Sequence, residues 1–221
     1  FFFTIITLLP LSLILGPAIS LINVLIISFS FLILCFFLKS YQFFKKKELL
    51  LLLVLNFYLI FNSFISLDFY SGFARNFGFL RFILLFLFIN YFFFKFEKSD
   101  KLFNIWLIVV LVISVDVFIE AIFGTNLVGF GNDPLVYTTR IVSFFKDEPI
   151  AGAFIYGFSF ILIGHLFNKY SENKKSKLII LFLPILFLIS VLITGERSNS
   201  IKFFTGFVLF FLFSHFLKKK V

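Results

Sequence analysis

Long apolar runs alternate with short polar clusters along all 221 residues of the chain. Many of these runs approach the roughly 20 residues that an α-helix needs to cross about 30 Å of hydrocarbon. Backbone polar groups inside a bilayer have to be satisfied within the segment, so each run predicts a membrane-spanning helix. Eight spans are expected, at about residues 1–15, 17–38, 48–66, 76–94, 102–122, 149–167, 177–194 and 201–217. The stretch "PLSLILGP" at the first junction is either a re-entrant break or a tight turn.

The composition favours a membrane protein over a soluble one, since 61% of the residues are hydrophobic and 42 are Phe. The predicted fold class is an all-α polytopic transmembrane helix bundle, with residues 1–221 forming a single transmembrane domain. The chain contains no Met and starts within an apolar run, so we expect a fragment of a longer protein. Its one cysteine, Cys35, lies in a predicted span and indicates neither a disulfide nor a metal site.

Lysine clusters follow every second predicted span. Because positive charge is enriched in cytoplasmic loops, these clusters mark the cytoplasmic face. They are Lys39, Lys45, Lys46 and Lys47; Lys95, Lys98 and Lys101; Lys169, Lys174, Lys175 and Lys177; and Lys218, Lys219 and Lys220. The opposite face then carries loops at about 67–75, 123–148 and 195–200, which we expect to lie in the periplasm or its equivalent.

Every arginine of the chain is predicted on this outer side: Arg75, Arg81, Arg140 and Arg197. Arginine is a planar, permanently charged fork that contacts carboxylates and phosphates at two points, so the pattern predicts a shared anion site. Arg81 is expected about 8 Å inside its span, where it has to face a polar cavity or a headgroup. Snorkelling to lipid phosphates is the alternative for Arg75 and Arg81 taken singly.

Two acidic residues, Asp116 and Glu120, lie one helical turn apart near the outer end of the fifth predicted span. They are expected to pair with the arginines or to help form a cavity; a proton or cation pathway, and a simple salt bridge to Arg81 or Arg140, are the alternatives. The histidines, His165 and His215, fall near cytoplasmic helix ends and are interpreted as interfacial.

The chain shows no phosphate-binding glycine loop, no Ser/His/Asp arrangement and no metal-ligand spacing. We therefore expect no cofactor and no metal, and no nucleic acid as partner. The residues alone indicate a membrane protein that binds an anion at its outer face.

Three segments resemble the O-antigen ligase and polymerase superfamily of bacterial envelope enzymes. They are "VDVFIEAIFGTNLVGF", "SFFKDEPIAGAF" after an arginine, and "LITGERSNSIKFF"; the early "LPLSLILGPAISLINVLI" is also similar to that family. Members are multi-helix glycosyltransferases of the GT-C type in the bacterial inner membrane, active on the periplasmic face in lipopolysaccharide biosynthesis. The resemblance implies transfer of a glycan from an undecaprenyl-diphosphate carrier to lipid A core or to a growing glycan, among membrane lipids.

The resemblance also implies site residues. The outer-loop arginine that the family aims at the carrier diphosphate matches Arg140, with Phe144, Phe145, Asp147 and Glu148 after it, while Ser143 and Lys146 stand where the family often has Gly. The second arginine, in a turn that closes a span, matches Arg197 within Thr194, Gly195 and Ser198. Arg75 and Arg81 are expected to join this diphosphate site. Asp147, Glu148, Glu196 and Asp116 are expected to support it, with Glu196 orienting Arg197 or a neighbouring arginine.

The catalytic base is not assigned, because the family carries its general-base histidine on a large outer loop that has no counterpart in these residues. Ligase and polymerase are not separable, since both use the same carrier. A transporter or flippase that uses Asp116, Glu120 and the arginines, and a non-catalytic membrane subunit, are the alternatives from other classes.

Overall fold

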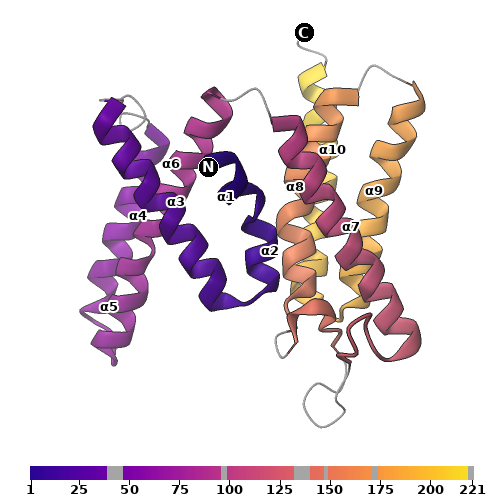
Figure 1. Ribbon diagram of the computed structural model, residues 1–221, viewed down its shortest axis with the longest axis horizontal. Coiled ribbons are helices and arrows are strands. Elements are labelled where there is room, and N and C mark those ends of the chain that lie inside the picture. Colours follow the sequence, from indigo (N-terminus) through magenta and orange to yellow (C-terminus); the bar gives the residue numbers. More distant parts are fainter. Residues whose placement is uncertain (39–46, 96–98, 132–139, 147–148, 171–173, 219–221) are drawn as a thin grey trace. The chain divides into compact units, whose positions relative to one another are not determined.

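The computed structural model of the protein describes residues 1–38, 47–95, 99–131, 140–146, 149–170 and 174–218. Within these ranges the regular structure is helical, and a single β-bridge joins Thr125 to Gly131. The predicted all-α class is thereby confirmed for this part of the chain. The helices form two compact units, Phe1–Leu102 and Phe103–Val221, which are described one at a time (Figure 1). A single transmembrane domain over residues 1–221 stays a prediction.

The first unit opens with a broken helix where one continuous span was expected. It contains α1 (Phe2–Thr7), α2 (Leu9–Ile14), α3 (Pro17–Leu38), α4 (Lys47–Ser63), α5 (Phe69–Gly78) and α6 (Leu80–Lys95). Pro10, which has no N–H to donate, lies in the first turn of α2. Gly16 adopts φ +122°, a conformation that favours glycine, and reverses the chain into α3. The "PLSLILGP" stretch is therefore a short helix and a tight turn.

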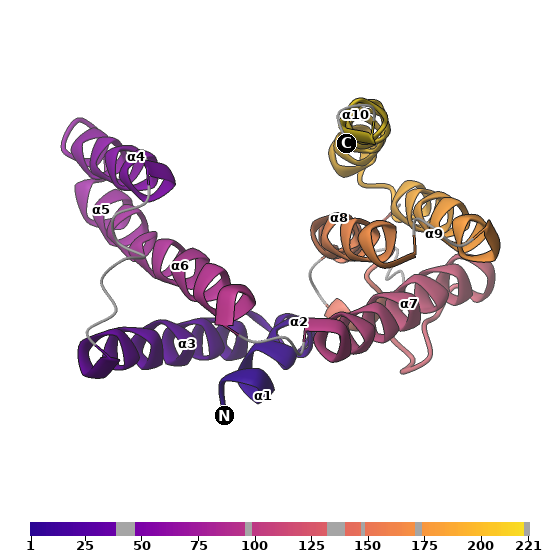
Figure 2. The same ribbon diagram turned by 90° about the horizontal axis from the view of Figure 1, so that it is seen from above.

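Phenylalanine rings form the core of the first unit. Phe31 of α3 packs against Phe88 and Tyr91 of α6, with ring centroids 6.1 and 5.8 Å apart. Phe2 of α1 reaches the same Phe88 ring at 5.4 Å. Edge-to-face and tilted ring pairs of this kind stabilise a contact beyond the area that they bury, so α1, α3 and α6 share one aromatic core. Figure 2 shows how the ribbons of these helices are arranged.

The predicted outer loop at 67–75 is wrong for most of its length, because α5 begins at Phe69. Asp68 caps this helix by accepting a hydrogen bond from the Ser71 N–H at 3.2 Å, and its contacts with Ser71 lower the pKa of the Asp68 carboxyl. A stripe of aromatic rings four residues apart then stabilises the helix: Phe69, Phe73 and Phe77 stack at 5.5 and 5.9 Å. Arg75 thus lies on a helix rather than in a loop.

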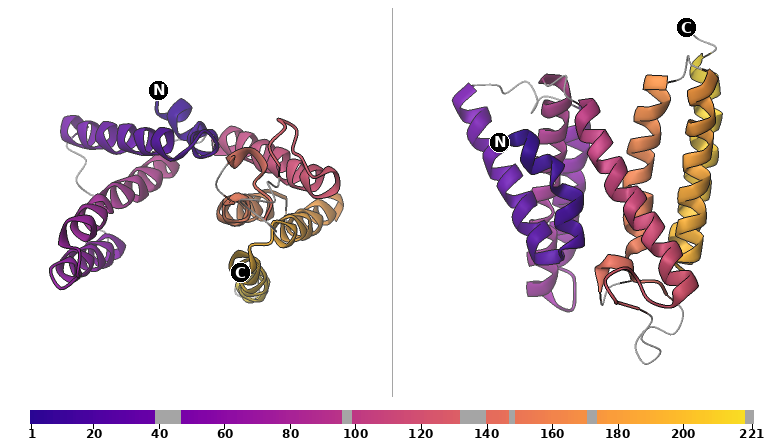
Figure 3. Two further views of the ribbon diagram at one scale, coloured as in Figure 1. Left: turned by 90° about the horizontal axis from the view of Figure 1, so that it is seen from below. Right: turned by 45° about the vertical axis from the view of Figure 1, so that its right-hand side comes forward.

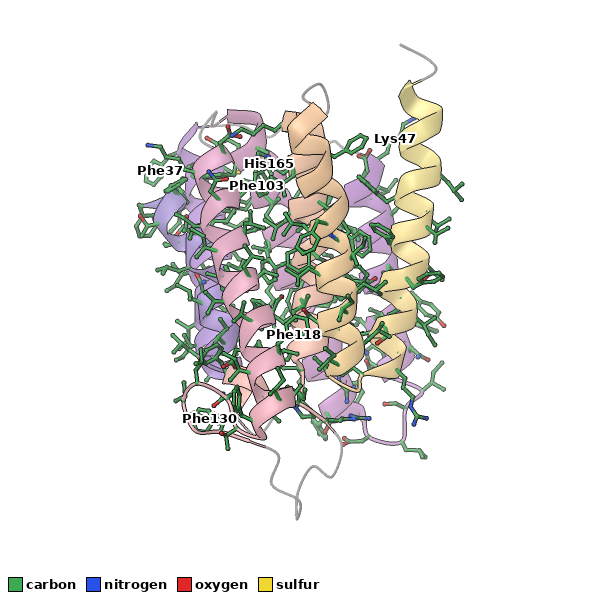
Figure 4. The ribbon with its side chains drawn as sticks, turned by 90° about the vertical axis from the view of Figure 1, so that its right-hand side faces the viewer. Phe37, Lys47, Phe103, Phe118, Phe130 and His165 are labelled. Carbon is green, nitrogen blue, oxygen red and sulfur yellow. The ribbon has the colours of Figure 1, made fainter. Side chains whose placement is uncertain are left out.

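The second unit contains most of α7 (Ser99–Phe123), a 3₁₀ turn η2 (Ser143–Phe145), α8 (Ala151–Tyr170), α9 (Lys174–Ile193) and α10 (Arg197–Lys218). Helices α8, α9 and α10 pack against one another (Figure 3). Aromatic contacts join α7 to α8: the ring centroids of Trp106 and Phe158 lie 5.3 Å apart, and those of Phe103 and His165 lie 4.3 Å apart in a tilted pair (Figure 4). His165 therefore packs between helices at the end of α8 that carries Lys169.

Three helical stretches of the described residues are long and apolar enough to cross a membrane: Pro17–Phe37, Phe69–Phe93 and Asp100–Phe123. Two shorter apolar helical stretches are Ala151–Phe167 and Phe182–Ile193. These features indicate a membrane protein, and the apolar side chains exposed along α4, such as Leu51 and Phe57, fit a lipid-facing surface. Eight crossings remain a prediction.

A pair of amide side chains, the buried Asn56 and the half-buried Asn76, joins α4 to α5. The Asn56 side chain donates to the main-chain oxygen of Asn76 at 2.8 Å. The Asn76 amide in turn donates to the main-chain oxygen of Leu59 at 2.8 Å and to the Ser63 hydroxyl at 2.7 Å. Because interhelical hydrogen bonds contribute to helix association in membranes, this network fixes the α4–α5 contact.

We predict that Asn76→Leu destabilises the protein by about 1 kcal/mol, since it removes two donors across the α4–α5 contact. The midpoint of unfolding in sodium dodecyl sulfate, followed by circular dichroism, measures the loss. Asn62→Leu, at an exposed position of α4, is the matched control and should leave the midpoint unchanged. Equal midpoints for the two variants would contradict the role given to the amide pair.

Candidate functional site

The loops of the second unit gather at one end of its helices. The end of α7, the start of α8 and the α9–α10 connection all meet there, together with segments 124–131 and 140–146 (Figure 1). Lys101 and Lys169 lie at the other end of these helices, near the start of α7 and the end of α8. The two arginines of this unit, Arg140 and Arg197, thus lie at the loop end, together with Lys146 and Lys202.

Two carboxylates on α7 hold the loops at this end. Asp116 and Glu120 are only 0% and 3% exposed. Asp116 accepts from the Leu127 N–H at 2.9 Å and from the Ser143 hydroxyl at 2.5 Å. Glu120 accepts from the N–H groups of Val142 at 3.1 Å and Ser143 at 2.6 Å. All four carboxylate oxygens therefore bind loop donors. The predicted pairing of these acids with an arginine stays a prediction.

Asn126 organises the loop that follows α7. Its side-chain oxygen accepts from the N–H groups of Val128 at 3.0 Å and Phe130 at 2.7 Å, which closes a tight turn. Its amide donates to the main-chain oxygen of Ser143 at 2.7 Å. The Asn126 side chain thus closes the turn in segment 124–131 and bonds this segment to segment 140–146.

The segment after Arg140 is anchored on two sides. Ser143, held by both α7 carboxylates, adopts φ +52°, a left-handed conformation uncommon for a residue with a side chain. The Ile141 N–H donates to the main-chain oxygen of Thr194, at the end of α9, at 3.3 Å. Arg140 therefore directly precedes a backbone segment that is hydrogen-bonded to α7 and to the end of α9.

Glu196 performs a similar task at the α9–α10 connection. Its carboxylate accepts from the Gly152 N–H, in the first turn of α8, at 2.7 Å and from the side-chain amide of Asn199. The expected role of orienting Arg197 or a neighbouring arginine stays a prediction beside these contacts. The predicted turn at 195–200 is also shorter than expected, because α10 begins at Arg197.

An open pocket of about 960 Å³ lies at this end of the unit. It is lined by Arg140, Leu192, Gly195, Glu196, Arg197, Ser198, Asn199, Ser200 and Ile201. The first turn of α10 borders the pocket, so the positive end of that helix dipole adds to the two guanidinium groups. The arrangement is suited to an anion with several oxygen atoms.

The structure brings together two of the four predicted anion-binding arginines, Arg140 and Arg197, on the wall of one pocket. Arg81 and Arg75 lie in the first unit; the Arg81 guanidinium stacks on the Phe82 ring at 4.9 Å. Their participation in a site with Arg140 stays a prediction. Two expected supporting residues, Asp147 and Glu148, lie outside the described residues.

Sequence reasoning missed several residues of this site, among them Asn126 and Gly152. Asn126 had a usable signal, because Asn in a glycine-rich loop often caps its own turn. Gly152 had none, since its importance comes from a close approach: a Cβ built there would lie 2.6 Å from the Thr194 hydroxyl and 2.9 Å from a Glu196 oxygen.

The chemistry of the pocket is that of charge stabilisation. Over the described ranges, no cluster of His, Cys, Asp and Glu suits a metal ion. Searches against protein-family models, curated proteins and solved structures find no match for this chain. The functional argument therefore depends on the geometry of the pocket.

We predict that Gly152→Ala destabilises the protein by about 1–3 kcal/mol, since the added methyl group displaces Glu196 and Thr194 from the start of α8. The midpoint of detergent unfolding measures the effect. Gly157→Ala, on the same helix with open space around it, is the matched control. It should keep or raise stability by up to about 1 kcal/mol, because Ala favours helix. If Gly152→Ala left the unfolding midpoint unchanged, that result would contradict the close approach of Gly152 to Thr194 and Glu196.

Proposed function

We propose that the protein is a membrane glycosyltransferase of the O-antigen ligase type, which binds an undecaprenyl-diphosphate-linked glycan on the periplasmic side of the bacterial inner membrane. The observation that carries this proposal is the pocket of about 960 Å³ with Arg140 and Arg197 in its wall. The resemblance noted in the sequence assigns the carrier diphosphate to these same two arginines. Lipid A core or a related glycan is the proposed acceptor.

The proposed reaction leaves a diphosphate, and two arginines suit that leaving group. A hydroxyl oxygen of the acceptor attacks the anomeric carbon, the bond from that carbon to the diphosphate oxygen breaks, and its electron pair stays on the diphosphate. The hydroxyl proton passes to a base, a histidine in the family that the chain resembles. The guanidinium groups that line the pocket would stabilise the growing negative charge without a metal ion.

The charge balance of the pocket supports an anionic ligand. Among the described residues that line the pocket, Glu196 is the one acidic residue, and its carboxylate binds Gly152 and Asn199. No ion pair with Arg197 is found in the part of the chain that the structure describes. The Arg197 side chain, which is exposed, is thus available to a ligand.

The pocket volume also fits a glycan carrier. A volume of about 960 Å³ lies at the upper end of the roughly 300–1,000 Å³ typical of small-molecule sites. A diphosphate fills a small part of it, which leaves room for sugar rings beside the arginines. The apolar helix surfaces that face lipid would accommodate the polyprenyl tail.

A polysaccharide polymerase uses the same donor chemistry and remains the alternative within this class. Transport is less well supported. Asp116 and Glu120, which a translocation path would need, have all their oxygens bound to loop donors.

We predict that Arg140→Ala and Arg197→Ala each reduce glycan transfer about 100-fold or more, because each removes a donor to the developing charge. Arg→Lys at either position should also fail, since lysine lacks the two-point fork. Transfer from an undecaprenyl-diphosphate-linked glycan, measured in bacterial membranes that contain equal amounts of each variant, is the test.

The matched control is Lys202→Ala, which removes one exposed positive charge from α10 outside the pocket. It should transfer glycan at the unaltered rate. Normal transfer by either arginine-to-alanine variant, or equal loss in the Lys202 control, would overturn the assignment.

A further inference from the structure

We infer that Asp116 and Glu120 are positioning residues, which fix Arg140 for its diphosphate ligand by holding Val142 and Ser143, the second and third residues after it. The inference rests on the proposed function, because it gives these carboxylates a role in the same site. It differs from the expected roles of a salt bridge, a cavity wall or a proton pathway.

The first step is the density of contacts directly after Arg140. Ile141 donates to the main chain of Thr194, and Val142 donates to Glu120. Ser143 uses all of its polar groups: its N–H binds Glu120, its hydroxyl binds Asp116, and its carbonyl accepts from an amide. Three consecutive residues are thus bound to three different parts of the second unit.

The second step is the cost of this arrangement. Two carboxylates that are almost fully buried have no cationic partner within the described ranges, and burial of such groups is unfavourable unless each oxygen is bound. Ser143 also keeps φ +52°, which a glycine would adopt with less strain. A strained residue of this kind persists only where several surrounding contacts hold its conformation, and such residues concentrate at functional sites.

The third step connects the contacts to the ligand. Two-point recognition of a phosphate by arginine depends on direction, and functional groups have to be held within about 0.5 Å and 10–20° of their working geometry. Thr194, which binds Ile141, comes three residues before Arg197. The anchored segment therefore sets the spacing between the two arginine-bearing parts of the pocket.

The test is a double-mutant cycle on the binding of inorganic pyrophosphate, measured by calorimetry on the whole chain in detergent micelles. Glu120→Gln keeps the size of the side chain and one carbonyl acceptor but loses the second. It should weaken pyrophosphate binding about threefold to tenfold. In an Arg140→Ala background, the same change should have almost no further effect, because the group that it positions is absent. In an Arg197→Ala background, its effect should persist.

A second variant keeps the test valid if Glu120→Gln folds poorly. Ser143→Gly removes the hydroxyl donor to Asp116 while it relieves the strain at φ +52°, so it should also weaken binding, by about threefold. Ser114→Ala is the matched control. Ser114 lies on α7 and is as buried as Ser143, but its hydroxyl donates to the main-chain oxygen of Val110 within its own helix. It should leave pyrophosphate affinity unchanged.

The outcomes separate this inference from the proposed function. If Arg140→Ala does not weaken pyrophosphate binding, the proposed diphosphate site is wrong. If Arg140→Ala weakens binding but Glu120→Gln and Ser143→Gly do not, the site stands and the positioning role is overturned. If the effects of Glu120→Gln and Arg140→Ala are fully additive, the carboxylate acts on stability alone, which also overturns the inference.

Discussion

Main-chain N–H groups at the end of a helix bundle have to find acceptors, and in the second unit two buried carboxylates provide them. Asp116 and Glu120 bind donors from Leu127, Val142 and Ser143, so the loops on either side of residues 132–139 are fixed to α7. The remaining features of the candidate site depend on these hydrogen bonds.

Glu196 extends the same principle to the α9–α10 connection. It satisfies an N–H group at the start of α8, where a helix leaves its first donors without partners. The acids of this region thus bind the backbone, and the arginines Arg140 and Arg197 face the pocket. This arrangement supports the proposed anionic ligand, because two arginines line the pocket while the carboxylate of Glu196 binds the start of α8.

The sequence predicted the helices well wherever an apolar run was uninterrupted, as in 17–38, which is α3 (Pro17–Leu38). It failed where local contacts decide the boundary. A break just before Pro10 divides the first run into two short helices, and an aspartate cap with an aromatic stripe forms α5 from most of the 67–75 loop. Arg140 and Arg197 were predicted as anion-binding residues from two features, the chemistry of arginine and their expected place on the outer side of the membrane. The role of Asp116 was not predictable, because its partner Ser143 lies 27 positions away in the chain.

The most direct test of the account is a cryo-electron microscopy structure of the protein in lipid nanodiscs with farnesyl diphosphate. The account predicts diphosphate density between the guanidinium groups of Arg140 and Arg197, with Ser143 still bound to Asp116 and Glu120. Diphosphate density elsewhere, or an empty pocket with those carboxylates turned toward the arginines, would contradict it.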